Sequence, residues 1–250
     1  MPADKSTLAL IGGTGLTELD EHSEQLEFNT PYGLPSAPIR VVSNDPIRLL
    51  FLPRHGSPHR FPPHCVNYRA NLWALREAGA NHVLAVSAVG GITDAYSPGV
   101  IAAPDQLIDY TWGRQHTFSD SGDVELVHVD FTQPYEGPLR RELLAAAKQE
   151  QLPLVDGGCI GVFQGPRLES AAEVERARRD GCDMAGMTSL PEAGLARELG
   201  LDYAGLAVIS NFGAGISGQP LSEDEIAETL REPMKKVRQL VRALVGRLAG

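Results

Sequence analysis

Short runs of aliphatic and β-branched residues alternate with segments of helical periodicity, and this alternation restricts the fold more than any other feature. The helical segment 67–79 is followed directly by the apolar run 83–89. The helical segment 191–199 leads in the same way into the apolar run 201–210. Such alternation is typical of helices packed on a largely parallel sheet. We therefore expect an α/β fold with a mixed, largely parallel central sheet flanked by helices.

The chain is long enough to bury a core of its own. Its 250 residues, 42% of them hydrophobic, fit one large domain spanning 1–250. Apolar residues recur at helical spacing over 230–244, which predicts one long amphipathic C-terminal helix with Pro233 as the place for a kink. Ser222 and Glu225 have the spacing of a capping box at its start.

Composition and charge argue against several classes of function. The formal net charge of −10 disfavours nucleic acid polymers and anionic membranes as partners, because the average field repels both. Three cysteines without CxxC spacing indicate neither a disulfide framework nor a zinc knuckle. The chain shows no basic leader with an apolar core, and no run of about 20 apolar residues that would span a bilayer. We expect a cytoplasmic protein that binds small molecules.

Three motifs at the ends of predicted strands suit an anion. The first apolar run leads into a glycine-rich turn around Thr14, whose backbone N–H groups can cradle a phosphate oxygen. Arg54 and His55 follow a second strand, and the planar guanidinium offers paired donors to phosphate. A third strand delivers Ser87 and Ala88 ahead of two glycines, which allow a ligand to approach the backbone closely. Taken alone, each motif also fits an ordinary turn or a surface pair.

Two other kinds of site fit these motifs less well. A dinucleotide loop would need a third glycine where Glu18 stands, and the Gly-Lys-Ser/Thr of a Walker loop is missing. His59 and His64 lie near His55 in the sequence, but no carboxylate or thiolate set completes a metal site. We expect neither a metal ion nor an organic cofactor.

Candidate residues for binding a flat ring and a sugar occur later in the chain. Phe163 and Leu168 could form apolar walls for a ring. Met187 and Thr188 stand just before a helix whose first carboxylate is Glu192. Core packing is the plain alternative for Met187.

The apolar run 201–210 ends in Asn211, Phe212 and Gly213, which sets a carboxamide at a strand terminus. A simple turn is the alternative explanation for Asn close to Gly. The span 111–137 is irregular and loop-like, and loops on an α/β scaffold often carry binding residues.

The order of these motifs carries more information than any one of them. Gly-Gly-Thr-Gly, Arg-His-Gly, Val-Asn-Tyr-Arg-Ala-Asn, Ser-Ala-Val-Gly-Gly, Gly-Pro-Arg, Gly-Met-Thr-Ser-Leu-Pro-Glu and Ser-Asn-Phe-Gly follow one another between residues 8 and 215. Together they resemble the trimeric purine nucleoside phosphorylase family, and most closely its methylthioadenosine phosphorylase branch. The resemblance implies a phosphorolytic enzyme that works as a homotrimer on a purine nucleoside.

The resemblance also implies roles for individual residues. The phosphate would be held by Thr14, Arg54, His55, Ser87, Ala88 and Thr188. Met187 would lie under the ribose, and Glu192 would bind a sugar hydroxyl. Phe163 and Leu168 would flank the base, although the methylthioadenosine branch generally has Phe in place of Leu168. His128 resembles a histidine that a neighbouring subunit lends to the site.

One departure from the branch concerns the base. The methylthioadenosine enzymes carry Asp-x-Asp where this chain has Asn211, Phe212 and Gly213. An amide NH₂ can donate to the O6 of hypoxanthine or guanine, whereas a carboxylate accepts from the amino group of adenine. Because a buried mismatch of donors is costly, Asn211 predicts a 6-oxopurine.

A second departure concerns the sugar. The phosphorylases of ordinary nucleosides commonly place a late histidine near the 5′-hydroxyl, but all seven histidines lie at or before His128. Leu221 and Ile226 are apolar enough for a 5′-methylthio group. The sequence thus predicts phosphorolysis of S-methyl-5′-thioinosine to hypoxanthine and 5-methylthioribose 1-phosphate in purine salvage, with inorganic phosphate as co-substrate.

Several alternatives stay open from the sequence. Within the enzyme class they are a methylthioadenosine phosphorylase and then a general inosine or guanosine phosphorylase. From other classes they are a nucleoside- or phosphate-binding protein without turnover and a dinucleotide-binding dehydrogenase. The loop 119–123 has no assigned role.

Overall fold

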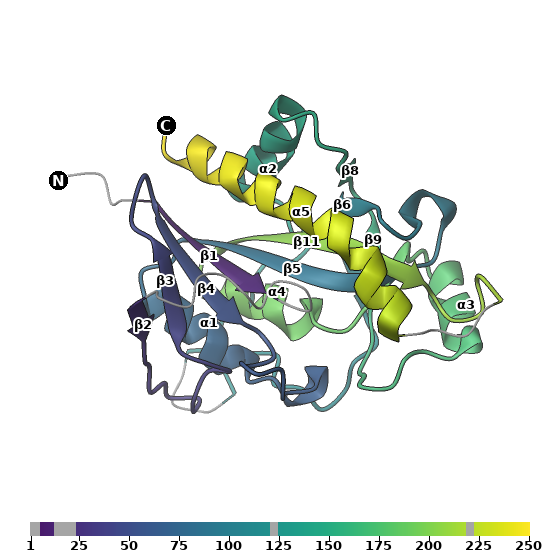
Figure 1. The fold of residues 1–250 in the computed structure, drawn as a ribbon. Coiled ribbons are helices and arrows are strands. Elements are labelled where there is room, and N and C mark those ends of the chain that lie inside the picture. Colours follow the sequence, from purple (N-terminus) through teal and green to yellow (C-terminus); the bar gives the residue numbers. More distant parts are fainter. Residues whose placement is uncertain (1–5, 13–23, 121–124, 219–222) are drawn as a thin grey trace.

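The longest apolar runs of the sequence form the central strands of one mixed sheet (Figure 1). The computed structural model describes residues 6–12, 24–120, 125–218 and 223–250, and within them 11 strands join in this sheet. In chain order the strands are β1 (Thr7–Gly12), β2 (Glu24–Leu26), β3 (Ile39–Ser43), β4 (Arg48–Pro53), β5 (His82–Gly91), β6 (Ile101–Ala103), β7 (Gln106–Asp109), β8 (Val155–Asp156), β9 (Cys159–Val162), β10 (Met184–Gly186) and β11 (Asp202–Phe212). The helices are α1 (Tyr68–Glu77), α2 (Pro138–Gln149), α3 (Ala171–Arg179), α4 (Ser189–Glu198) and α5 (Glu223–Leu248), with short 3-10 turns η1 (Pro63–Cys65) and η2 (Asp94–Tyr96).

The parallel part of the sheet is built around β5. Strands β1 and β11 pair with β5 in parallel on its two sides, and β4 continues the parallel order beyond β1. Strand β10 pairs antiparallel with the end of β5 and parallel with β9. At the other edge, β3 and β2 are antiparallel. This arrangement confirms the expected mixed, largely parallel α/β fold.

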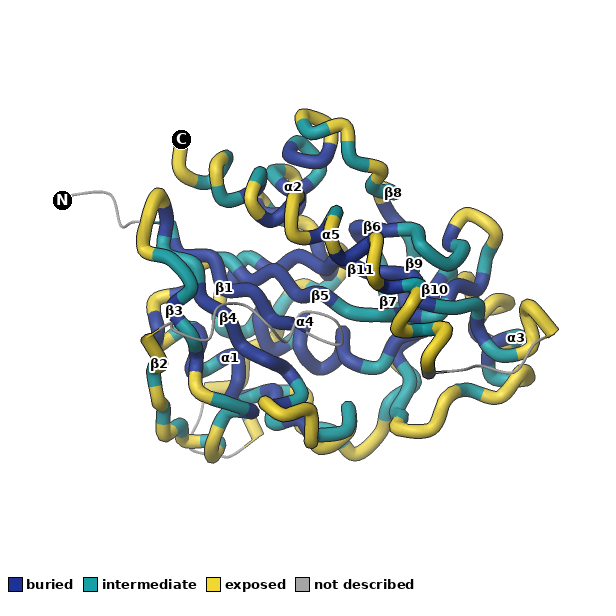
Figure 2. The backbone as a smooth tube through the Cα atoms, in the orientation of Figure 1, coloured by how far each residue is buried: buried dark blue, intermediate teal, exposed yellow. Residues whose placement is uncertain are grey.

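Alternate residues of each central strand enter two separate core layers, as the two-residue period of a strand requires. Leu8 and Leu10 of β1 pack with α2 and α5 on one face of the sheet. Ala9 and Ile11 pack with α1 and α4 on the other face. Figure 2 shows the central strands as the most deeply buried part of the chain. Because both faces are covered, these strands read as continuous apolar runs.

The predicted helices form close to their expected bounds. Asn67 caps α1, since its side chain accepts a hydrogen bond from the backbone N–H of Ala70 at 3.1 Å. The C-terminal segment is one helix, α5, with Pro233 inside it. Ser222, predicted to open this helix, lies outside the described residues. In the part of the chain that the structure describes, no helix is both long and apolar enough to cross a membrane.

The parallel pairing brings four strand ends to one edge of the sheet. Strands β1 and β4 end in register at Gly12 and Pro53, and the N–H of Arg54 donates to the carbonyl of Gly12 at 2.9 Å. Strand β11 runs beside β5 to Phe212 and Gly91. Ligands of α/β folds bind beyond the carboxyl ends of such strands. This edge is therefore the place to look for a site.

Candidate functional site

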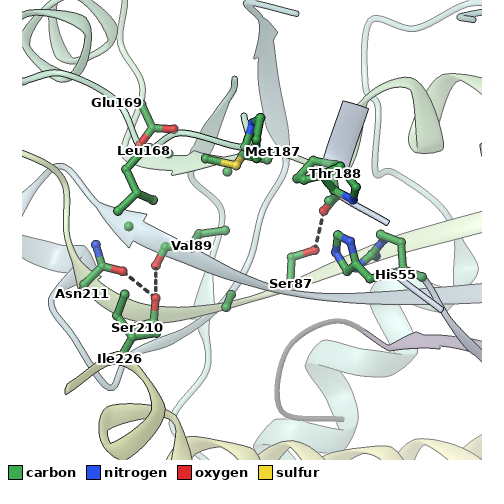
Figure 3. A pocket seen from close by; sticks show the side chains of 18 of the residues that line it. His55, Ser87, Val89, Leu168, Glu169, Met187, Thr188, Ser210, Asn211 and Ile226 are labelled. Carbon is green, nitrogen blue, oxygen red and sulfur yellow. Dashed lines mark hydrogen bonds between the residues drawn. The ribbon is translucent and has the colours of Figure 1, made fainter. Parts of the chain in front are cut away.

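A cavity of about 480 Å³ opens at this edge of the sheet (Figure 3). Its walls come from the ends of β4, β5 and β11, from the segment joining β10 to α4, from the loop before α3 and from the start of α5. Of the residues predicted from the sequence, the lining includes Arg54, His55, Ser87, Ala88, Leu168, Met187, Thr188, Asn211, Gly213 and Ile226. The structure thus brings together residues that are up to 172 positions apart, from Arg54 to Ile226.

One end of the cavity gathers hydroxyl and imidazole groups. Ser87 Oγ, in the second half of β5, lies 3.1 Å from Thr188 Oγ1, which belongs to the residue before α4. His55 lies on the same side of the view in Figure 3. These groups can surround an oxyanion, as predicted for Ser87, Thr188 and His55.

The tautomer of His55 follows from its hydrogen bond. Its Nδ1 lies 2.8 Å from the carbonyl oxygen of Phe61, which can only accept, so Nδ1 carries the proton. Burial, together with the charge of Arg54, lowers the pKa of His55 from 6.5 to about 4. The ring is therefore neutral at neutral pH, and its Nε2 is an acceptor. A neutral acceptor suits an oxyanion that still carries a proton.

Arg54 is held rigidly at the same end of the cavity. Its Nε and Nη2 donate to the two carboxylate oxygens of Glu192 at 2.7 and 2.9 Å. Its Nη1 donates to the carbonyl of Val86 at 3.0 Å. A guanidinium has five N–H groups, so one on each terminal nitrogen stays available for a ligand. Because Glu192 also accepts from Tyr203 Oη at 2.9 Å, its carboxylate is already occupied.

The structure brings Glu192 to Arg54 and leaves it outside the described lining of the cavity. Its predicted contact with a sugar hydroxyl stays a prediction. The geometry shows that Glu192 forms an ion pair with the guanidinium of Arg54.

Asn211 lies at the opposite end of the cavity, where a β-bulge sets its direction. Ile209 pairs with Val89 but Asn211 pairs with Gly90, so Ser210 is an extra residue in β11. Asn211 Nδ2 donates to the carbonyl of Phe212 at 2.7 Å, and Asn211 Oδ1 accepts from Ser210 Oγ at 2.7 Å.

The contact with the Phe212 carbonyl, which can only accept, identifies the nitrogen of the carboxamide, and Oδ1 then faces Ser210 Oγ. One N–H of Asn211 is left for a ligand. Gly90 of β5 pairs with Asn211, and a Cβ at Gly90 would lie only 3.3 Å from Asn211 Nδ2. A glycine at this position therefore leaves room for the carboxamide.

Glu169 lines the same cavity and is a residue that the sequence analysis missed. Figure 3 places it beside Leu168, on the same side of the view as Asn211. Burial, and then the charge of Glu173, raises the pKa of the Glu169 carboxyl, an effect that Arg167 opposes. Its position next to Leu168 could have indicated this role, because a carboxylate beside a residue that packs on the ring can accept a hydrogen bond from the edge of that ring.

Three predicted residues lie elsewhere. Phe163 lines a neighbouring hollow of about 240 Å³, where it stacks on Tyr110 at 5.0 Å between ring centroids. His128 is exposed on the loop before α2, and Phe212 follows Asn211 without lining the cavity in the described part of the chain. Thr14 and Leu221 lie outside the described residues.

The histidines near the cavity do not build a metal site in the described ranges. The rings of His55 and His59 lie 4.5 Å apart. Among the residues that the structure describes, no group of three or more His, Cys, Asp or Glu side chains is placed to hold a metal ion.

A cavity at the carboxyl ends of parallel strands, lined by hydroxyl, guanidinium, imidazole and carboxamide groups, is the kind of site in which α/β enzymes bind small molecules. The chain belongs to the Phosphorylase superfamily, whose family model matches residues 7–246. This match confirms the resemblance that the order of the motifs predicted.

Named relatives narrow the comparison. The "Probable S-methyl-5'-thioinosine phosphorylase" of Xanthomonas campestris pv. campestris is 55% identical over 218 residues, which cover 86% of this chain and 87% of that protein. The "6-oxopurine nucleoside phosphorylase" of Pyrococcus furiosus is 38% identical and covers 95% of this chain and 91% of its own. A solved methylthioadenosine phosphorylase from Schistosoma mansoni in complex with adenine has a TM-score of 0.91 at 30% identity, covering 97% of this chain and 91% of that one.

Proposed function

We propose that this enzyme catalyses the phosphorolysis of S-methyl-5′-thioinosine, releasing hypoxanthine and 5-methylthioribose 1-phosphate. Inorganic phosphate is the co-substrate, and no metal or organic cofactor takes part. The observation that carries the proposal is the pair of Asn211 and Glu169 at one end of the cavity. Four relatives named "Probable S-methyl-5'-thioinosine phosphorylase", 48 to 55% identical to this chain, support the same substrate.

The pair suits a 6-oxopurine and opposes a 6-aminopurine. Hypoxanthine offers acceptors at O6 and N7 and a donor at N1–H. The free N–H of Asn211 can donate to either O6 or N7, and the Glu169 carboxylate can accept from N1–H. Adenine has an acceptor at N1, which a carboxylate would repel. A site with such buried polar groups discriminates strongly, because the wrong base leaves them unpaired.

The apolar lining near the base suits the thioether of the sugar. Ile226, on the first turns of α5, lines the cavity and supplies apolar surface for this group. Apolar surface of this kind is stabilised by burying a methylthio group, whereas a 5′-hydroxyl there would lose its hydrogen bonds to water.

The reaction requires one bond to break and one to form. The C1′–N9 bond breaks with its electron pair going to the purine, and an oxygen of hydrogen phosphate forms the new bond to C1′. The proton that hydrogen phosphate gives up ends on the purine, which is released as neutral hypoxanthine. Asn211 donates to the purine as negative charge grows on it, so this hydrogen bond is stronger in the transition state than in the bound substrate. Arg54, Ser87 and Thr188 hold the phosphate next to C1′. His55 accepts from the P–OH group, which turns the unprotonated oxygens towards the sugar.

The active assembly in this proposal is a cytoplasmic homotrimer in which His128 completes the site of a neighbouring subunit. The segment carrying His128 exposes Leu126 and Val127, which are 67% and 46% accessible. Exposed apolar residues side by side in the sequence suit burial against a second copy of the chain. Cys65, Cys159 and Cys182 are free thiols, as suits a reducing compartment.

Release of free base tests the proposal. Purified protein is incubated with methylthioinosine, methylthioadenosine, inosine, guanosine or adenosine, each with and without phosphate. We expect hypoxanthine chiefly from methylthioinosine and only with phosphate. Preference for methylthioadenosine would contradict the role of Asn211 and Glu169, and preference for inosine would contradict the apolar 5′ pocket. Binding without phosphorolysis of any of the five would favour a binding protein.

A further inference from the structure

Arg114 lies in the loop between β7 and α2, and all five N–H groups of its guanidinium are hydrogen-bonded. Its Nη1 donates to the carbonyl oxygens of Met187 at 2.8 Å and Leu190 at 2.6 Å. Its Nη2 donates to the carbonyl oxygens of Phe163 at 3.1 Å and Gln164 at 2.8 Å. Its Nε donates to the side-chain oxygen of Gln164 at 3.2 Å. One planar group therefore joins two backbone segments that are distant in sequence.

Both segments lead directly into walls of the cavity. Met187 and the residue after it, Thr188, line the cavity themselves. The segment from Phe163 continues through a glycine to the lining residues Leu168 and Glu169. Arg114 is not among the residues of the described chain that line the cavity, so it acts from behind these walls.

The two segments also touch each other. Gly165 has a φ of +60°, and a Cβ at this position would lie 2.6 Å from Met187 Sδ. A larger residue here would be strained at this positive φ and would push the Met187 side chain aside. The spacing between the two walls is therefore set by one close contact at Gly165 and by the hydrogen bonds of Arg114.

A lysine cannot replace this arrangement. The guanidinium presents its donors in a fixed plane, whereas a lysine ammonium presents three donors from one atom and cannot reach four carbonyl groups. Leu190 also depends on Arg114, because its backbone is extended (φ −120°, ψ 139°) within the first turn of α4. A partly buried carbonyl left without a donor destabilises the segment that carries it.

We propose that Arg114 is a positioning residue for the phosphorolysis. It holds Met187 and Thr188, on the oxyanion side, at a fixed distance from Leu168 and Glu169, on the ring side, so that phosphate and purine are bound in line with C1′. This inference rests on the proposed function and deepens it. A displacement of about 1 Å between reacting groups can cost about 100-fold in rate.

The test compares Arg114→Ala and Arg114→Lys with Arg48→Ala. Arg48 is a matched control, because it donates to the carbonyl of Ala78 at 2.6 Å from the other end of β4, away from the cavity. We expect kcat/KM for nucleoside and phosphate to fall about 100-fold in both Arg114 variants, mainly through kcat, and to stay near wild type in Arg48→Ala. Guanidinium ion at low, non-denaturing concentration should restore part of the activity of Arg114→Ala alone.

The proposal is overturned if Arg114→Lys has wild-type kinetics or if guanidinium gives Arg114→Ala no recovery. Should Arg114→Ala fail to fold, Arg114→Lys decides by the same criterion. If the wild type cleaves no nucleoside, the proposed function fails, and hypoxanthine binding by calorimetry becomes the readout. Weaker binding by Arg114→Lys than by Arg48→Ala would then support the positioning role, and equal binding would overturn it.

Discussion

Arg54 and Glu192 form a two-point ion pair at the base of the cavity, with Nε to Oε2 at 2.7 Å and Nη2 to Oε1 at 2.9 Å. Both side chains are 1% exposed. Burial of the guanidinium lowers the Arg54 pKa, but the charge of Glu192 and its hydrogen bonds outweigh burial, so the pKa is raised. A permanent cation is thus fixed where the proposed phosphate binds.

Removing the carboxylate should destabilise the protein strongly. Glu192→Ala leaves the Arg54 guanidinium buried without its counter-ion, which costs about 3–5 kcal/mol in the free energy of unfolding. Tyr203→Phe removes only the third donor to Glu192 and should cost about 1–3 kcal/mol. Urea unfolding of both variants measures the difference. A Glu192→Ala variant no less stable than Tyr203→Phe would contradict the assigned role of the pair.

Glu169→Gln should lower kcat/KM for methylthioinosine by about 10–100-fold, because an amide is a weaker partner for N1–H than a carboxylate is. Glu175→Gln is the matched control, since Glu175 is an acidic residue of α3 that pairs with Arg178 and Arg179 away from the cavity. Steady-state kinetics on both variants provide the measurement. Equal kcat/KM for the two variants would show that Glu169 does not contact the base.

Acidic pH should lower activity on an oxopurine through Glu169. Burial raises the pKa of this carboxyl above the ordinary 4.5. As pH falls through the raised pKa, the carboxyl gains a proton and stops accepting from N1–H. The pH profile of kcat/KM should therefore show an acid limb above pH 4.5, and Glu169→Gln should lack it. An acid limb unchanged by the substitution would assign the titration to another group.

His55 should make the folded state less stable in acid. Its pKa is about 4 in the folded protein and 6.5 ordinarily, so between these values the unfolded chain binds a proton that the folded chain does not. Stability therefore rises with pH across this window, and the cost is complete below about pH 4. Thermal unfolding of His55→Asn should depend less on pH than that of the wild type or of exposed His116→Asn. An identical pH dependence in all three would contradict the buried, neutral state of His55.

Subunit exchange tests the predicted role of His128. His128→Ala should be inactive for lack of the lent side chain, and Asn211→Ala for lack of the donor to the base. Mixed oligomers contain some sites with both residues intact, so exchange of subunits between the two variants should restore part of the activity. Mass spectrometry confirms that exchange has taken place. Confirmed exchange without any recovery would show that His128 does not act across an interface.

Local patterns were enough to predict much of the fold. The helix from Asn67 and the long helix α5 follow from apolar periodicity and from terminal residues, which depend on neighbours in sequence. The gathering of Arg54, Ser87 and Asn211 in one cavity follows from parallel strands, whose carboxyl ends meet at one edge.

Contacts across long sequence distances could not be predicted in the same way. Arg54 and Glu192 are 138 positions apart, and no spacing rule links them. Arg114 belongs to a span without helical or strand periodicity, so the sequence contains no pattern from which its hydrogen bonds to two distant segments could be predicted. The bulge at Ser210 is a one-residue change in strand register, which the apolar run conceals.

The central claim is that Asn211 and Glu169 select a 6-oxopurine over a 6-aminopurine. The ratio of kcat/KM for methylthioinosine to kcat/KM for methylthioadenosine, measured with wild-type protein and saturating phosphate, tests it most directly. We predict a ratio of about 100 or more, since the wrong base leaves buried polar groups unpaired. A ratio near unity, or one that favours methylthioadenosine, would contradict the claim.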